Sequence, residues 1–129
     1  MSGSGRLYGA TYHGNSVEIG LARDAELAAI AGSVFPASTR DLLDPWSLVA
    51  IRNLDGCRTE VHALGWRAAL GNTWITSTLV GVDLQMRGVS TRSGYVYRLG
   101  TEEVPGPSPE LRDHLVYALH TWGFTDVGS

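Results

Sequence analysis

Residues 46–100 alternate short segments rich in β-branched and aromatic residues with closely spaced turn signals. The turn signals are Asp55-Gly56, Gly71-Asn72, Met86-Arg87-Gly88 and Ser93-Gly94. Because turns this short join antiparallel neighbours, the region predicts a β-meander of four to five antiparallel strands. Residues 73–85, which contain no turn residue pair, are expected to form one of these strands.

A C-terminal amphipathic helix is the second prediction. Ser108 suits the N-cap position, Pro109 suits the first helical position, and Gly123 ends the helix. Apolar residues share one of its faces: Leu111, Leu115, Ala118, Leu119 and Trp122. This stripe must be buried, and the sheet is the obvious partner.

Residues 6–45 carry weaker signals. Residues 24–31 predict a short helix with Asp24 at its N-cap and Gly32 after its end, and residues 38–43 predict a further helical turn that Pro45 stops. Residues 6–14 favour a short strand. The predicted fold class is α+β, with an antiparallel sheet covered on one face by the C-terminal helix and the short N-terminal helices.

Length and composition predict a single globular domain over residues 1–129, with a flexible N-terminus at residues 1–5. The chain has 129 residues, of which 43% are hydrophobic and 18% charged, as is typical of one folded domain. Cys57 is the only cysteine, so no internal disulfide is expected. With no leader and no long apolar run, we expect a cytoplasmic protein that does not interact with membranes.

Residues that usually carry catalysis or bind cofactors form no established motif. The four histidines, His13, His62, His114 and His120, lack the i, i+4 spacing of a helical metal site. The glycines match no phosphate-binding loop, and the chain contains no lysine. We therefore expect no catalytic residue, no metal and no cofactor, and we expect the chain not to be an enzyme.

One enzymatic pattern remains as an alternative. Thr76-Ser77-Thr78 on a predicted strand, with arginines before it and Glu102-Glu103 after it, resembles the Arg, Ser-Thr-Ser and Glu-x-Glu pattern of ADP-ribosyltransferases. The resemblance implies an enzyme that uses NAD and depends on Ser77 and Glu103. It covers only these positions, and the two glutamates are adjacent, which on a strand turns them to opposite faces.

The segment RSGYVYR, residues 92–98, combines arginine and tyrosine as some nucleic-acid-binding surfaces do. A two-residue loop would pair Arg92 with Tyr95, which places Tyr95 and Tyr97 on one face and turns Arg98 to the other. We expect both tyrosines to lie half-buried under the C-terminal helix. The alternative is an aromatic patch that faces a ligand or a protein.

Small size, mild acidity and the lack of an active-site motif favour a protein-binding module. The formal net charge of −3 gives little general attraction to nucleic acid. A small-ligand-binding or nucleic-acid-binding domain that uses the arginine and tyrosine hairpin is the alternative, and an ADP-ribosyltransferase-like enzyme comes third. A specific case of the leading hypothesis is an inhibitor of a host defence complex encoded by a phage or mobile element, like an anti-CRISPR protein.

The expected partner is a protein, and self-association is left open. The candidate interaction surface combines the hairpin with tryptophans and acidic residues elsewhere in the chain. Its members are Trp66, Arg67, Trp74, Asp83, Arg92, Tyr95, Tyr97, Arg98, Glu102 and Glu103. Tryptophan, tyrosine and arginine are common anchors of protein interfaces, and acidic residues suit a partner with a nucleic-acid-binding surface.

Overall fold

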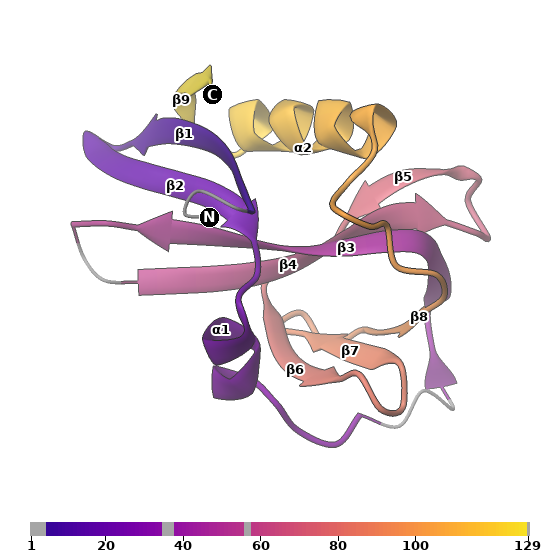
Figure 1. Ribbon diagram of the computed structural model, residues 1–129. Helices are drawn as coiled ribbons and strands as arrows, with labels where there is room; N and C mark the ends of the chain where they lie inside the picture. Colours follow the sequence, from indigo (N-terminus) through magenta and orange to yellow (C-terminus); the bar gives the residue numbers. More distant parts are fainter. Residues whose placement is uncertain (1–4, 35–37, 56–57, 129) are drawn as a thin grey trace.

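The computed structural model describes residues 5–34, 38–55 and 58–128, and Figure 1 shows their arrangement. The strands are β1 (Arg6–Tyr12), β2 (Asn15–Leu21), β3 (Asp41–Asn53), β4 (Arg58–Arg67), β5 (Asn72–Ile75), β6 (Leu79–Asp83), β7 (Gly88–Thr91), β8 (Val96–Leu99) and β9 (Thr125–Gly128). The helices are α1 (Asp24–Ala29) and α2 (Pro109–Thr121). Neither of these two helices is long and apolar enough to cross a membrane.

All nine strands of the described chain belong to one mixed sheet with β3 at its centre. The strand order is β6-β7-β8-β3-β2-β1-β9, and β4 pairs with both β3 and β5. Along one edge of β3, the first residues pair with β8 in parallel and the later residues pair with β2 antiparallel. The α+β class is confirmed, but the simple antiparallel meander of four to five strands is wrong.

Residues 73–85 form two strands, β5 and β6, where we expected one. The break falls at Thr76, whose backbone N–H donates to the carbonyl of Ala63. The Thr76 hydroxyl then accepts from the N–H of Ala63 at 3.0 Å. Because this side chain takes the place of a backbone partner, the chain can leave β4 at this point and cross to β7.

The N-terminal part of the chain departs furthest from prediction. The helical turn predicted for residues 38–43 is wrong, because Asp41 and Leu43 begin β3 and pair with β8. Pro45 lies inside β3, where the register with β4 shifts and no ladder hydrogen bond is needed. Helix α1 is confirmed, although Arg23 rather than Asp24 is at its N-cap. Of the residues expected to be flexible, 1–4 lie outside the described part of the chain.

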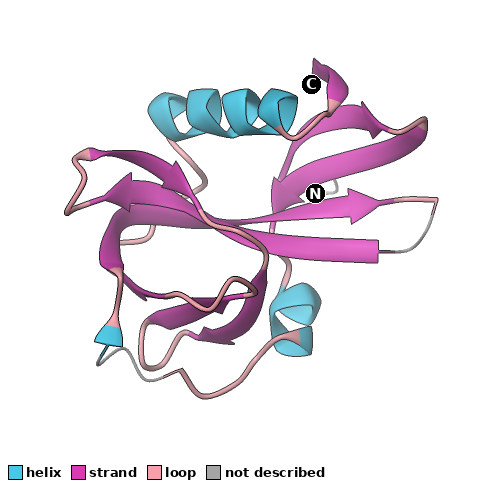
Figure 2. Ribbon diagram, turned by 180° about the vertical axis from the view of Figure 1, so that it is seen from behind, coloured by secondary structure: helices cyan, strands magenta, loops and turns pink. Residues whose placement is uncertain are grey.

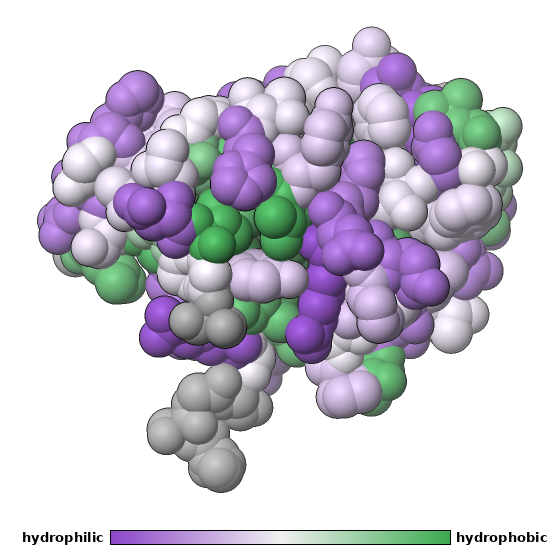
Figure 3. All heavy atoms as spheres, turned by 90° about the horizontal axis from the view of Figure 1, so that it is seen from above, coloured by the Kyte–Doolittle hydropathy of each residue, from purple (hydrophilic) through white to green (hydrophobic). Residues whose placement is uncertain are grey.

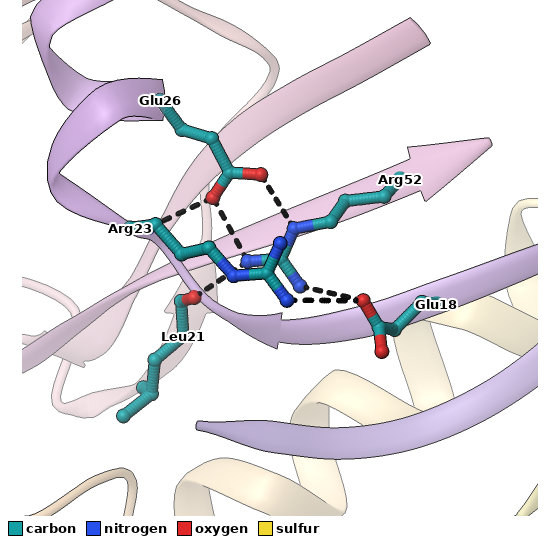
Figure 4. Close-up of polar contacts among 5 residues, drawn as sticks. All are labelled: Glu18, Leu21, Arg23, Glu26 and Arg52. Carbon is teal, nitrogen blue, oxygen red and sulfur yellow. Dashed lines mark hydrogen bonds and ion pairs between the residues drawn. The ribbon is translucent and has the colours of Figure 1, made fainter. Parts of the chain in front are cut away.

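Arg52 of β3 holds α1 against the sheet (Figure 4). Its guanidinium donates to both carboxylate oxygens of Glu26 on α1, to the carbonyl of Leu21 at 2.8 Å and to Glu18 on β2 at 3.3 Å. Burial alone raises the pKa of Glu26, but hydrogen bonds from Arg52 and from the Arg23 amide outweigh it and lower the pKa. The short helix therefore depends on a charged network as well as on apolar contacts.

The long β3–β4 hairpin, confirmed as predicted, lies between α2 on one side and β6 and β7 on the other (Figures 1 and 2). It separates two hydrophobic cores. Alternate residues of a strand face opposite sides, so both faces of the hairpin are apolar. One core, here called the sheet-covered core, contains Leu43, Trp46, Leu48, Ala50, Val61, Ala63, Leu79, Val82, Val89, Tyr97 and Leu99. The other, the helix-covered core, contains Ala10, Val17, Ile19, Val49, Leu64, Leu111, Leu115, Leu119 and Phe124.

Helix α2 forms as its local signals predict. The Ser108 hydroxyl accepts from the backbone N–H of Leu111, and Gly123 follows the helix with a φ of +98°. Leu111, Leu115 and Leu119 of the apolar stripe are buried in the helix-covered core, and Ala118 is buried as well. Trp122, at the end of the stripe, is 36% exposed. The helix does not cover the tyrosines, however, because Tyr97 lies in the sheet-covered core on the other side of the hairpin.

The hairpin between β7 and β8 has a three-residue loop in place of the predicted two-residue one. Tyr97 pairs with Val89, and the Thr91 N–H donates to the carbonyl of Tyr95, which leaves residues 92–94 in the loop. Gly94 has a φ of +96°, a conformation that favours glycine in such loops. In this register Tyr97 is 2% exposed and Tyr95 is 45% exposed.

Candidate interaction surface

Arginine and aromatic side chains gather at one end of the sheet-covered core. We call this group the arginine–aromatic cluster; it consists of Arg40, Asp41, Arg67, Trp74, Tyr95 and Tyr97. Strand pairing brings its members together from distant parts of the sequence. Asp41 pairs with Tyr97 across β3 and β8, and β5 places Trp74 beside the end of β4.

The inner half of the cluster is a buried ion pair between two rings. The Arg67 side chain is 9% exposed, and its Nε donates to Oδ2 of Asp41 at 2.8 Å. Its guanidinium carbon lies 4.7 Å from the ring centroid of Trp74 and 6.0 Å from that of Tyr97. Guanidinium groups over aromatic faces are stabilised by cation–π attraction.

Asp41 stays ionised in this setting. Burial raises the pKa of its carboxyl group, but hydrogen bonds from the backbone amides of Leu42 and Ala69, together with Arg67, hold the pKa below its ordinary value. The charge of Arg67 is therefore compensated within the cluster.

The outer half of the cluster is open to solvent. The exposed Arg40 places its guanidinium carbon 3.9 Å from the ring centroid of Tyr95 and 5.8 Å from that of Trp74. Its Nη1 also donates to the Tyr97 hydroxyl at 3.4 Å. No ion pair to Arg40 exists among the described residues. The cluster thus presents an oriented but uncompensated positive charge beside an exposed tyrosine.

Trp74 carries an unusual feature between these two halves. Its indole Nε1 is buried and has no hydrogen-bond partner in the described part of the chain. An unpaired buried donor costs about 1–3 kcal/mol.

The other predicted surface residues lie elsewhere or have structural roles. Trp66 is 43% exposed but faces away from its strand neighbour Arg67, and Arg92 and Arg98 are exposed around β8. The acidic members do not gather at the cluster. The Asp83 carboxylate accepts from the amides of Val34 and Met86, that of Glu103 accepts from the amide of Ser108, and Glu102 is exposed.

The sequence therefore identified four members of the cluster, Arg67, Trp74, Tyr95 and Tyr97, but not that they meet. Arg40 and Asp41 were missed because the segment around them was expected to be helical. No local signal predicts the parallel pairing of β3 with β8 that brings Asp41 to Tyr97. A basic residue followed by an acidic one, as in Arg40-Asp41, occurs at helix ends as well as at strand ends, so this pair does not distinguish the two structures.

The residues of the transferase-like pattern do not assemble as the resemblance implies. Thr76-Ser77-Thr78 links β5 to β6 and is not part of a strand. The carboxylate beside it is Glu60, which accepts from the Thr78 hydroxyl at 2.7 Å. Glu102 and Glu103 line a different cleft, next to Leu84 and Val104.

No group of three or more histidine, cysteine, aspartate or glutamate residues in the described ranges could hold a metal ion. Cys57 lies outside those ranges. In comparisons with known proteins, the chain matches no family model, no curated protein and no solved structure.

Proposed function

We propose that this chain is a protein-binding module whose docking surface is the outer half of the arginine–aromatic cluster. The observation that supports this proposal best is the exposed Arg40–Tyr95 stack, at 3.9 Å. Arginine and tyrosine are frequent anchors of protein interfaces. A stack that exists before binding loses less side-chain entropy on association than two freely rotating side chains do.

The charge of this surface suggests the chemistry of its partner. Asp41 compensates Arg67, whereas no carboxylate in the described part of the chain pairs with Arg40, and Arg92 is exposed in the adjacent hairpin loop. A partner that offers a carboxylate to Arg40 and a flat apolar or aromatic group to Tyr95 fits this arrangement. An inhibitor of a defence complex is one form of this function, in which the module occupies an acidic face of that complex.

A capture experiment with matched variants tests the proposal. The tagged protein is compared with an Arg40→Ser/Tyr95→Ser double variant in lysate of the cells that encode it, and bound proteins are identified by mass spectrometry. The matched control is Arg112→Ser/Tyr117→Ser, which removes the same residue types from the exposed side of α2. We expect a stoichiometric partner with the wild type and the control, and a loss of at least about tenfold with the Arg40/Tyr95 variant.

Two outcomes contradict the proposal. One is a partner that both double variants retain equally, and the other is the absence of any stoichiometric protein. Salt-sensitive retention on single-stranded DNA that is lost only in the Arg40/Tyr95 variant would identify the same surface as a nucleic-acid-binding one. Circular dichroism of both variants establishes that they are folded.

A further inference from the structure

A cleft of about 540 Å³ lies on the helix-covered side of the β3–β4 hairpin, away from the arginine–aromatic cluster. It is bounded by the C-terminal end of α2, the outer part of the hairpin and the link between β5 and β6. Seen from the α2 side, most of the surface is hydrophilic or intermediate, and hydrophobic residues show only in small separate patches (Figure 3). The size of the cleft suits a small molecule.

Three polar residues of β4 follow one another along the floor of this cleft. Arg58, Glu60 and His62 are alternate residues of the strand, so their side chains share one face. The same face carries Leu64 further along, where α2 covers it. The polar row therefore begins at the point where α2 no longer covers this face of β4. Packing against the helix does not explain why these residues are polar.

His62 is fixed in one tautomer at the inner end of the row. Its Nδ1 lies 2.9 Å from the carbonyl of Thr76, and because a carbonyl only accepts, Nδ1 carries the proton. Burial outweighs this hydrogen bond and lowers the pKa of His62, so the ring is neutral at pH 7. A neutral ring with a protonated Nδ1 leaves a lone pair on Nε2, and no described residue donates a hydrogen bond to it.

Aromatic rings form the walls around His62. The ring of Trp122, at the end of α2, lies 5.1 Å from the ring of His62. Tyr12 and Phe124 stack on each other at 4.5 Å and also line the cleft, as does Ile51. A planar apolar group is the kind of ligand that such walls accept.

The outer end of the cleft favours an anion over a cation. Both carboxylate oxygens of Glu60 are already used, one by the Thr78 hydroxyl at 2.7 Å and the other by Arg58 at 3.3 Å. The Arg58 side chain is 71% exposed, so its remaining donors are free to reach a ligand. Arg92 lines a neighbouring cleft, and its positive charge opposes the protonation of His62 that the Glu60 carboxylate favours.

We propose that this cleft is a binding site for a small aromatic acid. The aromatic ring lies between the walls formed by Tyr12, Phe124 and Trp122, and a hydroxyl or N–H group of the ligand donates to Nε2 of His62. The carboxylate of the ligand lies at the outer end and pairs with Arg58. The site is independent of the protein-binding surface, because the two occupy opposite faces of the β3–β4 hairpin.

Para-hydroxybenzoate carries this combination of groups and serves as the probe. Its binding is followed by the indole N–H resonance of Trp122 in protein NMR spectra, with the other three tryptophans as internal controls. A ligand of this size is expected to saturate the site at about 10 mM or below. We expect the Trp122 resonance to shift, and benzoate, which lacks the donor, to bind several-fold more weakly.

Variants at the rim of the cleft distinguish binding at this site from non-specific binding. Ser77→Phe fills the cleft from an exposed wall position and is expected to abolish binding. Arg58→Gln is expected to weaken para-hydroxybenzoate about tenfold while leaving the uncharged para-hydroxybenzamide unchanged. Arg98→Gln, an exposed arginine on β8, and Tyr95→Ser are controls that should bind as the wild type does.

Three results would overturn the proposal. The first is no shift of Trp122 at saturating probe, and the second is a shift that is equal in all four tryptophans. The third is binding that Ser77→Phe and Arg58→Gln both leave intact. Loss of partner capture by the Arg40/Tyr95 variant with unchanged probe binding would support both sites separately.

Discussion

Arg52 and Arg67 lie at opposite ends of the β3–β4 hairpin, and their side chains are 7% and 9% exposed. Arg52 donates from all three guanidinium nitrogens to two carboxylates and a carbonyl. Among the described residues, Arg67 donates only through Nε, to Asp41, and aromatic rings face the rest of its guanidinium.

This difference separates a structural arginine from one that organises a surface. Arg52 uses four of its five N–H donors within the fold, which fixes α1 and leaves only one donor for a partner. The incompletely bonded Arg67 instead orders the rings on which the exposed Arg40 packs. Two arginines that are equally buried can therefore have different roles. The number of guanidinium N–H donors without a partner distinguishes these roles better than burial does.

Removing Arg67 should have the largest effect on stability. Arg67→Met leaves the carboxylate of Asp41, whose side chain is 4% exposed, without its charged partner. Breaking a buried pair in this way costs about 3–5 kcal/mol. Urea denaturation should show this loss, whereas Arg98→Met, at an exposed position, should change the free energy of unfolding by less than about 0.5 kcal/mol. Equal stabilities of the two variants would contradict the assignment of Arg67 to a buried pair.

Removing Arg52 should have a smaller effect, although Arg52 makes more hydrogen bonds. The side chains of Glu18 and Glu26 are 21% and 14% exposed, so water can solvate them when Arg52→Met removes their partner. We expect a loss of about 2–3 kcal/mol, measured by urea denaturation. Arg23→Met is the matched control: Arg23 contacts the same Glu18 but is 61% exposed, so it should cost less than about 1 kcal/mol. A larger loss of stability for Arg52→Met than for Arg67→Met would contradict the view that the burial of the remaining carboxylate determines the cost.

Local signals explain which parts of the fold the sequence predicts. Helix α2 forms as expected because its cap, its proline and its terminal glycine all act within a few residues of one another. The hairpin signal at Asp55 likewise acts locally and brings β3 beside β4. The second strand of the N-terminal hairpin, β2, was not predicted from the sequence. The structure shows that it is joined to β1 by a tight turn in which His13 and Gly14 both have a positive φ.

Non-local pairing explains what the sequence could not predict. The parallel contact of β3 with β8 and the departure of the chain at Thr76 depend on residues far away in sequence. The same contacts assemble the arginine–aromatic cluster and the cleft. One signal of the cleft was visible: Arg58, Glu60 and His62 alternate along a strand, which places polar residues on a single face.

The free energy of unfolding should depend on pH in a different range for each side of the β3–β4 hairpin. On the sheet-covered side, Glu26 and Asp41 have lowered pKa values. Their contribution to stability is present above the ordinary carboxyl pKa of about 4 and is lost as the pH falls below it. In the cleft, burial lowers the pKa of His62, so the unfolded chain takes up a proton near pH 6.5, about the ordinary histidine value, and the folded chain does not.

Stability should therefore begin to fall at two different pH values as acid is added. Between about pH 7 and 5.5, each buried histidine contributes a loss of at most about 1.4 kcal/mol per pH unit, the smallest effect predicted here. Burial also lowers the pKa of His114, so the His62→Gln variant should remove only part of this slope and the His62→Gln/His114→Gln variant should remove more. Urea denaturation across this range measures the slope directly. A slope that His62→Gln leaves unchanged would mean that His62 takes up its proton at the same pH in the folded and the unfolded chain, so that burial does not lower its pKa.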